Sequence, residues 1–270
     1  MEFETAMRAT QRSRAARLIN HPFRLARRKL TNHPKQVQTR TFWGDSMTVV
    51  LPEEVSCRIY EFGIWEPGLT RLLIDRIRPG WVLFDVGAHF GYFSLLSSHL
   101  GAKVHAFEPT PTTCKMLRSN VGDRVSVNEV ALWNANGSVP ITDFGVVKSA
   151  FNTVGKTNNL TDKTAAHTVI QVPATTIDDY VARTGAVPHL IKLDVERVEE
   201  QVVDGAHRTL ANHKPLVTVE VGEGEESRRL LHQMAEMGYR PFDITIEGVS
   251  PHSLRSSYTY DNLLLVHGSM

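Results

Sequence analysis

The chain has 270 residues and a hydrophobic share of 41%, which suits one domain of ordinary enzyme size with a sizeable core. Its 30 basic and 29 acidic residues leave a net charge of +1, so the chain as a whole offers no electrostatic case for a nucleic-acid partner. Two cysteines provide neither a disulfide framework nor a zinc-binding spacing. No apolar run reaches membrane-spanning length and no apolar leader is visible, so we expect a cytoplasmic protein without stable membrane insertion.

Residues 1–40 are predicted to form a basic N-terminal arm, because ten Lys and Arg side chains face only Glu2 and Glu4. We expect one or two short helices, broken near His21 and Pro22. Packing on the rest of the chain or on a second copy of the chain is favoured, which leaves a homodimer open. The alternatives are contact with a membrane surface or an acidic partner, and a nucleic-acid arm.

Residues 41–80 are predicted to form a β/α lead-in that packs on the core. Residues 41–43 and 47–51 flank a turn and give a hairpin signal. Residues 59–66 continue in a β-rich pattern. Residues 69–77 carry leucine and isoleucine at helical spacing and lead into the next strand.

The stretch from Trp81 to Gly101 organises the predicted domain, which covers residues 81–270. An apolar run over residues 81–86 predicts a buried strand, and residues 92–100 have helical spacing. Gly87 and Gly91 bracket the turn between them. Because ligands in open α/β sheets bind outside the carboxyl ends of the strands, Asp85 and this turn are predicted to surround a small-molecule site.

The turn has the pattern D-x-G-x-x-x-G instead of the dinucleotide pattern G-x-G-x-x-G. A carboxylate at Asp85 would repel a pyrophosphate, whereas it suits S-adenosylmethionine, which has an ammonium, a sulfonium and no phosphate. The next strand, residues 103–107, ends at Glu108, where an acid can grip ribose hydroxyls. Glu108 alone does not separate this cofactor from a nicotinamide cofactor, so an oxidoreductase is a minor alternative.

The rest of the chain alternates between strand and helix patterns. Residues 130–132 are placed to lie against an adenine ring, and the insertion over residues 133–189 is predicted to form part of a substrate lid. Strands are expected at residues 125–130, 139–142, 168–172, 189–195, 215–221, 240–246 and 262–266, and helices at 111–120, 177–181, 198–210 and 226–237. This order predicts a mostly parallel sheet with one antiparallel strand near its edge.

Two acids, Asp194 and Glu196, follow the strand over residues 189–195, where a parallel sheet would bring Asp194 beside Asp85. Asp194 is the first candidate for the catalytic base, followed by Glu196 and His89, with Glu220 as a further candidate. Asp194 could instead only hold the cofactor. A divalent metal on Asp194, Glu196 and Glu220 is an alternative, but no tight ligand spacing supports it and no metal site is predicted.

Several motifs together resemble the FkbM family of S-adenosylmethionine-dependent methyltransferases. They are FDVGAHFGYFS (84–94), FEP (107–109), NEVAL (128–132), TTIDDYV (175–181), IKLDVE (191–196), DGAHRTL (204–210) and VTVEV (217–221). The resemblance implies the class I methyltransferase fold, a Rossmann-like α/β sheet of seven strands with the last antiparallel. It also implies O-methylation of a hydroxyl on a sugar, polyketide or other natural product. Expected cofactor-binding residues are Asp85, Gly87, Ala88, His89, Gly91, Glu108, Pro109, Ala131 and Asp194.

Two positions depart from the family pattern. His89 stands where the family usually has Asn, and Arg197-Val198 stand where it usually has Gly-Ala. His89 can position the cofactor or act as a base. The bulky Arg197 cation beside the expected acceptor site weakens any inference of the acceptor from relatives. N- or carboxyl-methylation of a peptide or acid, and a non-catalytic cofactor-binding relative, are the alternative functions.

Overall fold

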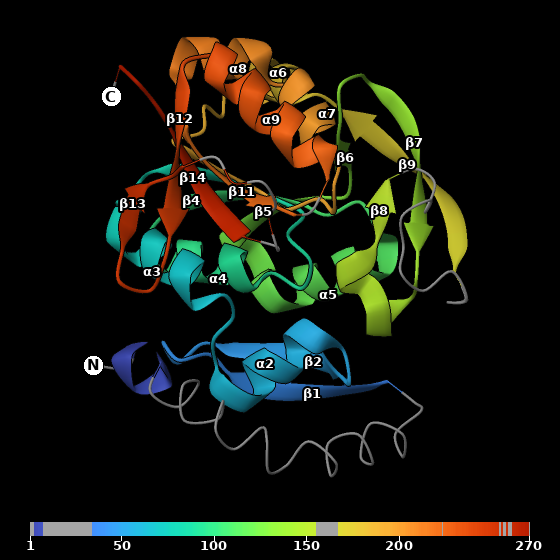
Figure 1. The fold of residues 1–270 in the computed structure, drawn as a ribbon. Helices are drawn as coiled ribbons and strands as arrows, with labels where there is room; N and C mark the ends of the chain where they lie inside the picture. The colour runs from blue at the N-terminus through green and yellow to red at the C-terminus, as the bar shows by residue number, and fades with distance from the viewer. Residues whose placement is uncertain are drawn as a thin grey trace.

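The computed structural model describes residues 3–7, 34–154, 167–222, 224–253, 255, 258 and 261–269. Residues 8–33 of the predicted basic arm, including the break predicted near His21 and Pro22, lie outside this part of the chain. In the part described, a large twisted sheet is sandwiched between two helical layers, and an N-terminal hairpin layer and a smaller sheet lie beside it (Figure 1).

The large sheet has eight strands in the order β13-β12-β14-β11-β10-β3-β4-β5. Five strands of this sheet run parallel to one another: β3, β4, β5, β10 and β11. Strand β14 inserts antiparallel between β11 and β12. This confirms the predicted α/β fold with a mostly parallel sheet and an antiparallel strand near one edge, and β13 extends the sheet beyond the seven strands expected. The bounds are β3 (Val82–Val86), β4 (Lys103–Phe107), β5 (Val125–Asn128), β10 (Leu190–Leu193), β11 (Leu216–Val221), β12 (Tyr239–Ile244), β13 (Val249–Pro251) and β14 (Asp261–His267).

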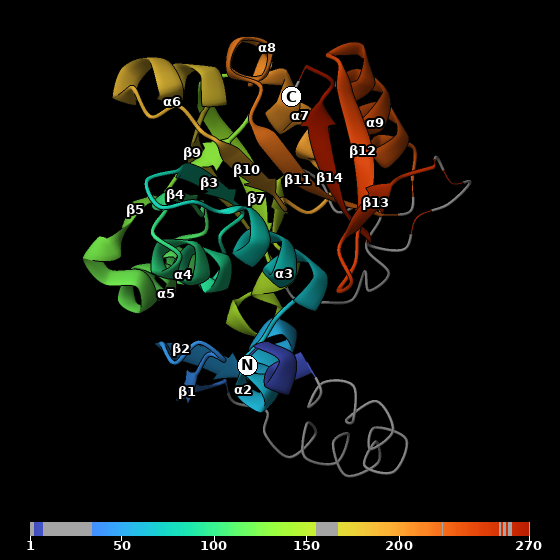
Figure 2. The same ribbon diagram turned by 90° about the vertical axis from the view of Figure 1, so that its left-hand side faces the viewer.

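Helices cover both faces of this sheet, which explains its apolar central strands. On one face lie α3 (Pro67–Arg76), α4 (Tyr92–His99) and α5 (Pro111–Val121), and on the other lie α6 (Ile177–Thr184), α7 (Glu199–Asp204), α8 (His207–His213) and α9 (Glu225–Glu236) (Figures 1 and 2). Successive residues of β3 enter different cores: Leu83 belongs to one buried cluster and Phe84 to the other. Such two-sided burial is what an unbroken apolar run predicts.

The N-terminal layer differs from the prediction. The hairpin pairs β1 (Lys35–Arg40) with β2 (Ser46–Leu51), so its first strand lies in residues assigned to the basic arm and not at residues 41–43. Residues 54–62, partly predicted as β-rich, form helix α2 (Glu54–Phe62). The Glu53 side chain caps this helix, because its carboxylate accepts hydrogen bonds from Val55 N at 2.9 Å and Ser56 N at 2.7 Å.

The insertion after β5 builds the smaller sheet, in the order β6-β9-β7-β8. Its long strands, β7 (Gly137–Asp143) and β9 (Thr168–Thr175), pair antiparallel and confirm the strands predicted there. The strand predicted over residues 125–130 ends earlier, at Asn128, and β6 (Ala131–Leu132) pairs with β9. The 3-10 helix η2 (Val146–Phe151) and β8 (Thr153–Val154) complete the described part of the insertion.

The single helix predicted over residues 198–210 is wrong, since α7 and α8 are separated at Gly205 and Ala206. The chain passes very close to Trp133 at this point: a Cβ on Gly205 would lie 2.0 Å from the Trp133 carbonyl oxygen. The Gly205 carbonyl also accepts a hydrogen bond from Asp178 N at 3.0 Å. The break therefore ties α7 and α8 to the start of α6.

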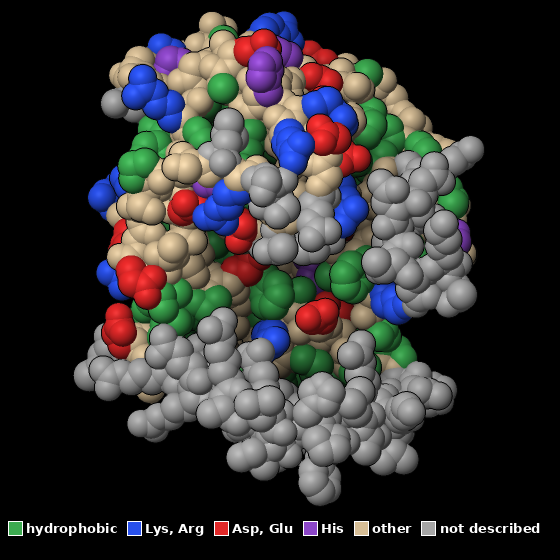
Figure 3. All heavy atoms as spheres, in the orientation of Figure 1, with side chains coloured by type: hydrophobic (Ala, Val, Ile, Leu, Met, Phe, Trp, Pro, Cys, Tyr) green, Lys and Arg blue, Asp and Glu red, His purple; other side chains and the backbone are tan. Residues whose placement is uncertain are grey.

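The surface carries mixed charge. On the face seen in Figure 3, Lys and Arg side chains of the described residues are interspersed with Asp and Glu and do not gather into one basic patch. Within the same described residues, every helix is too short or too polar to cross a bilayer.

Candidate active site

A cleft opens at the carboxyl ends of the parallel strands. It is lined by the turn after β3, by the residues that follow β4 and β10, and by Glu220 of β11. The lead-in contributes Trp65 and Glu66, and the insertion contributes Ser149 and Asn152. The position agrees with the rule for ligand sites in open α/β sheets.

Glu108 lines one end of the cleft with a carboxylate that two backbone amides hold in place. Its Oε2 accepts from His89 N at 3.1 Å and its Oε1 accepts from Thr110 N at 3.0 Å. Burial, with only 7% of the residue exposed, raises the pKa of Glu108 to about 7 against these hydrogen bonds. Each oxygen keeps a lone pair, so the carboxylate can still accept bonds from the hydroxyls of a ribose.

An apolar wall stands next to Glu108. Pro109, Val130, Ala131 and Leu132 all line the cleft, and Ala131 and Leu132 are buried. An apolar surface beside a fixed acceptor for hydroxyl groups suits a nucleoside, with its base on the wall and its sugar at Glu108. The predicted positions of Glu108, Pro109 and Ala131 therefore come together in one place.

Asp85 takes a different place from the one predicted. It is 1% exposed and does not line the cleft. Its Oδ2 accepts a hydrogen bond from Ser94 Oγ at 2.6 Å, and its Oδ1 lies 3.5 Å from Lys192 Nζ. Because Lys192 and Asp85 are register partners in β10 and β3, the lysine stands between this carboxylate and the cleft-lining Asp194. A direct contact between Asp85 and a cationic ligand stays a prediction, and this arrangement does not favour it.

Lys192 is the central cation of the site. It is 3% exposed, donates to Asp194 Oδ2 at 3.0 Å and to the Gly87 carbonyl at 3.5 Å, and lies 5.2 Å from the centre of the Phe93 ring. Burial lowers the pKa of Lys192, but the carboxylates around it, first those of Asp194 and Asp85, outweigh burial and raise the pKa above its usual value. The ammonium therefore stays charged and joins the tips of β3 and β10.

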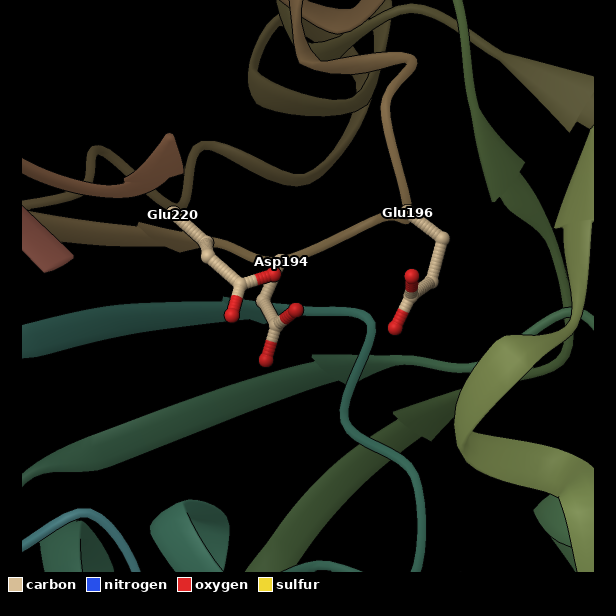
Figure 4. Close-up of side chains that lie close together, drawn as sticks. All are labelled: Asp194, Glu196 and Glu220. Atoms are coloured by element: carbon tan, nitrogen blue, oxygen red, sulfur yellow. The ribbon is translucent and has the colours of Figure 1, made fainter. Parts of the chain in front are cut away.

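Three acids converge at the other end of the cleft. Asp194 and Glu220 project from neighbouring strand ends and Glu196 from the loop after β10 (Figure 4). One carboxylate oxygen from each lies within 4.8 Å of the others. Burial and the Asp194 charge raise the pKa of Glu220 to about 8 and the pKa of Glu196 well above its usual value. Asp194, whose side chain is 26% exposed, forms an ion pair with Lys192 Nζ at 3.0 Å.

His89 lies in the turn between the two ends of the cleft. Its Nε2 is 2.8 Å from Ser149 Oγ, and its ring stacks on Phe90 with centroids 3.9 Å apart. Removal from water lowers the pKa of His89 to about 3, so the ring is neutral near pH 7 and weakly basic. This geometry favours the positioning role for His89 over the catalytic one.

Comparison with known proteins assigns the chain to a protein family. A model of the methyltransferase FkbM domain matches residues 85–241, which is 157 of the 270 residues. The chain belongs to the FkbM methyltransferase domain family. The family implies a methyl donor of the S-adenosylmethionine type, and the cleft has an apolar wall beside the Glu108 carboxylate that suits the nucleoside of such a donor.

A curated relative of this FkbM-family chain is the 31-O-demethyl-FK506 methyltransferase FkbM of Streptomyces tacrolimicus. The two sequences are 32% identical over a 157-residue alignment, in which 48% of this chain and 60% of the relative are covered, so the chain spans less than two thirds of that relative's length. A crystal structure of methyltransferase FkbM from Methylobacillus flagellatus is similar over 71% of this chain and 44% of that one, with 17% identity and a TM-score of 0.44. Cofactor-bound Rv0187 from MTB is similar over 74% and 78%, with 14% identity and a TM-score of 0.41.

The backbone of the loop after Asp194 gives a physical reason for the glycine that the family usually has at the position of Arg197. Glu196 and Arg197 are successive non-glycine residues with positive φ, at 56° and 75°. A glycine at the Arg197 position, as the family usually has, adopts this backbone without strain. The chain instead tolerates the strain, and Glu199 steadies the loop by accepting a hydrogen bond from Val195 N at 3.0 Å.

Sequence reasoning missed two residues that define the acidic end of the cleft, Lys192 and Glu66. A lysine inside an otherwise apolar strand was a usable signal for Lys192, because a buried ammonium needs acidic partners. Glu66 gave no such signal, since its position depends on an unusual backbone conformation at the start of α3.

Gly87 is expected to be indispensable to the turn. Its φ is +77°, and a Cβ there would lie 1.8 Å from the Asp194 carbonyl oxygen, which is backbone and cannot swing aside. We predict that Gly87→Ala weakens S-adenosylhomocysteine binding at least tenfold and destabilises the fold by more than the roughly 1–2 kcal/mol of left-handed strain alone. Gly185→Ala is the control, because Gly185 has φ +69° with no atom within 4 Å of an added Cβ. Equal losses of stability in calorimetry would contradict the close approach to β10.

Glu220 is expected to destabilise the protein at alkaline pH. Its pKa is about 8 when folded and about 4.3 when unfolded, so between these values the folded state holds a proton that the unfolded state lacks. Stability from this group is complete below about pH 4 and is lost as the pH rises through 8. We predict that the neutral variant Glu220→Gln has a higher free energy of unfolding than wild type at pH 8 and the same free energy of unfolding at pH 4. Urea unfolding checks this, with the exposed Glu247→Gln as control; a deficit at pH 8 would contradict it.

The three converging acids raise the question of a metal ion. Lys192 already places a permanent cation 3.0 Å from Asp194 Oδ2, so the group does not need a divalent ion to balance Asp194. We predict that EDTA treatment leaves methyl transfer within about twofold of the untreated rate. Loss of activity that Mg²⁺ restores would instead assign a metal to Asp194, Glu196 and Glu220.

Proposed function

We propose that this chain transfers a methyl group from S-adenosylmethionine to a hydroxyl of a small molecule, such as a sugar or another natural product. The observation that carries the proposal is one cleft that joins a nucleoside-shaped end, at Glu108 and Leu132, to a cation-paired carboxylate, Asp194, at the opposite end. A methyltransferase needs both: a place for the donor and a proton acceptor beside the reacting carbon.

The donor supplies a methyl carbon made electrophilic by the sulfonium to which it is attached. The chain must then hold the acceptor in line with that carbon and remove the hydroxyl proton, because a protonated hydroxyl is a poor nucleophile. Asp194 is the residue that we propose accepts this proton. Its bond from Lys192 fixes one carboxylate oxygen, Oδ2, and leaves Oδ1 for the acceptor.

The choice of an oxygen acceptor has support from the curated relative, whose name describes a methyltransferase acting on a 31-O-demethyl compound. Arg197, which departs from the family pattern, directly follows Glu196 and is exposed. Because this cation lies beside the proposed acceptor site, the acceptor of this chain need not match that of the relative. Transfer to nitrogen or to a carboxylate is the competing outcome.

Donor binding is the first test of the proposal. S-adenosylhomocysteine is expected to raise the melting temperature of the full chain, whereas NAD is not. Glu108→Ala is expected to abolish the shift, because the ribose loses its acceptor. A shift with NAD alone, or no shift with S-adenosylhomocysteine, would reject a methyltransferase.

Product analysis is the second test. The protein is incubated with ¹³C-methyl donor and a panel of alcohols, amines and carboxylic acids, and the labelled products are resolved by NMR. A methoxy signal supports the proposal. An N-methyl or methyl-ester signal assigns the competing chemistry, and donor binding without any methylated product favours a non-catalytic relative.

A further inference from the structure

The Glu66 carboxylate lies in the cleft with one oxygen hydrogen-bonded and the other without a hydrogen-bond partner among the described residues. Glu66 is the residue before α3 and lines the cleft together with Trp65, Tyr92 and Phe93. Its Oε1 accepts a hydrogen bond at 3.1 Å from Nδ2 of Asn262, which lies at the start of β14. Its Oε2 is buried and accepts no hydrogen bond from any residue that the structure describes. A buried carboxylate oxygen in this state is costly unless a ligand supplies a donor.

The backbone of Glu66 is held in an unusual conformation. Its φ is 38° and its ψ is 75°, in the left-handed region that non-glycine residues rarely adopt. Pro67 follows, and proline pushes the preceding residue toward extended backbone. Such a strained backbone is unfavourable and persists only where its surroundings hold it, often at ligand sites. Here the conformation goes with a side chain that lines the cleft.

The charges around Glu66 leave it in need of a cation. Asp194 and Lys192 of the β10 end and Glu220 of β11 act on it electrostatically. The ammonium of Lys192 makes its ion pairs with Asp85 and Asp194 and its remaining hydrogen bond with the Gly87 carbonyl. Burial first, and then Asp194, raise the pKa of Glu66 to about 7. A second positive group beside Glu66 would relieve this excess of acid.

We propose that Glu66 binds the primary ammonium at the amino-acid end of the methyl donor. The inference rests on the proposed function and assigns the role that the sequence pattern gave to Asp85, whose oxygens face Ser94 and Lys192 instead. Glu108 and Glu66 then mark the two ends of the donor, the ribose and the ammonium. An amine on the acceptor has the same chemistry, and the experiment separates the two sources.

The test compares two ligands that differ at the ammonium. S-adenosylhomocysteine carries it, and 5′-methylthioadenosine has the same nucleoside without the amino-acid end. Calorimetric titrations are made with wild type, Glu66→Gln and the control Glu247→Gln, which changes an exposed glutamate in the turn after β12. Glu66→Gln is expected to weaken S-adenosylhomocysteine binding about 10- to 100-fold, as befits a lost charge-assisted hydrogen bond, and to leave 5′-methylthioadenosine within twofold. The control is expected to leave both within twofold.

Each other outcome counts against the inference in a distinct way. Unchanged S-adenosylhomocysteine affinity in Glu66→Gln overturns it and leaves an amine of the acceptor as the candidate partner of Glu66. Equal weakening of both ligands overturns it by showing that Glu66 only shapes the cleft. Failure of wild type to bind either ligand overturns the proposed function as well. A melting temperature of Glu66→Gln at or above that of wild type shows that the variant is folded, and Glu66→Asp, which keeps the charge, is expected to recover part of the affinity.

Discussion

Asp194→Asn is expected to lower the rate of methyl transfer by about 10²- to 10⁴-fold, the usual contribution of a positioned general base. The carboxamide has nearly the same shape and can still accept a hydrogen bond from Lys192, but it cannot take a proton from a hydroxyl. Donor binding is expected to stay within about threefold. Single-turnover methyl transfer and titration with S-adenosylhomocysteine measure the two effects separately.

The control for this experiment is Asp123→Asn, which changes an exposed aspartate in the 3-10 helix η1 (Gly122–Arg124). It is expected to leave both quantities unchanged. If Asp194→Asn instead kept the rate of the bound complex and lost donor affinity, Asp194 would be a cofactor ligand and the base would lie elsewhere. His89→Asn, which restores the residue usual in the family, is expected to lower the rate less than tenfold, because a ring with a pKa of about 3 is a weak base at neutral pH.

The sheet and the nucleoside end of the cleft could be predicted because local signals carry them. An apolar run such as that of β3 specifies a strand buried on both faces, and a parallel sheet brings the residues after each strand to one edge. Glu108 and Asp194 needed no more than that rule to be placed in the cleft. Thr176 caps α6, since its Oγ1 accepts a hydrogen bond from Asp179 N at 3.0 Å, and a threonine before a helical pattern is a local signal of the same kind.

The acidic end could not be predicted because it depends on register and on backbone strain. The strand tips suggested that Asp85 faces a ligand, but the register of β10 against β3 sets Lys192 directly beside it. Glu66 reaches the cleft through a left-handed backbone that no periodicity reveals. In α2, aromatic and β-branched residues favoured strand, and the cap by Glu53 together with burial of Ile59 made the segment helical.

Lys192→Met is expected to destabilise the protein by about 3–5 kcal/mol at pH 8, because it leaves buried acids without their cation. Methionine fills most of the space of the lysine stem, so the loss reflects charge more than a cavity. Urea unfolding at pH 8 and pH 5 measures it. Lys103→Met is the control, since Lys103 is exposed at the start of β4, and it is expected to change stability by less than about 0.5 kcal/mol.

The pH dependence separates charge from packing in this variant. As the pH falls, protons neutralise the acids that Lys192 no longer balances, so the folded variant takes up more protons than its unfolded state and its deficit shrinks toward pH 5. A deficit that is the same at pH 8 and pH 5 would mean that the lysine stem matters for its packing on Phe93 and not for its charge. In the double variant Lys192→Met/Asp85→Asn, where the most buried acid is neutral, part of the lost stability is expected to return. That recovery would show that the pair at the tips of β3 and β10 acts as one unit beneath the cleft.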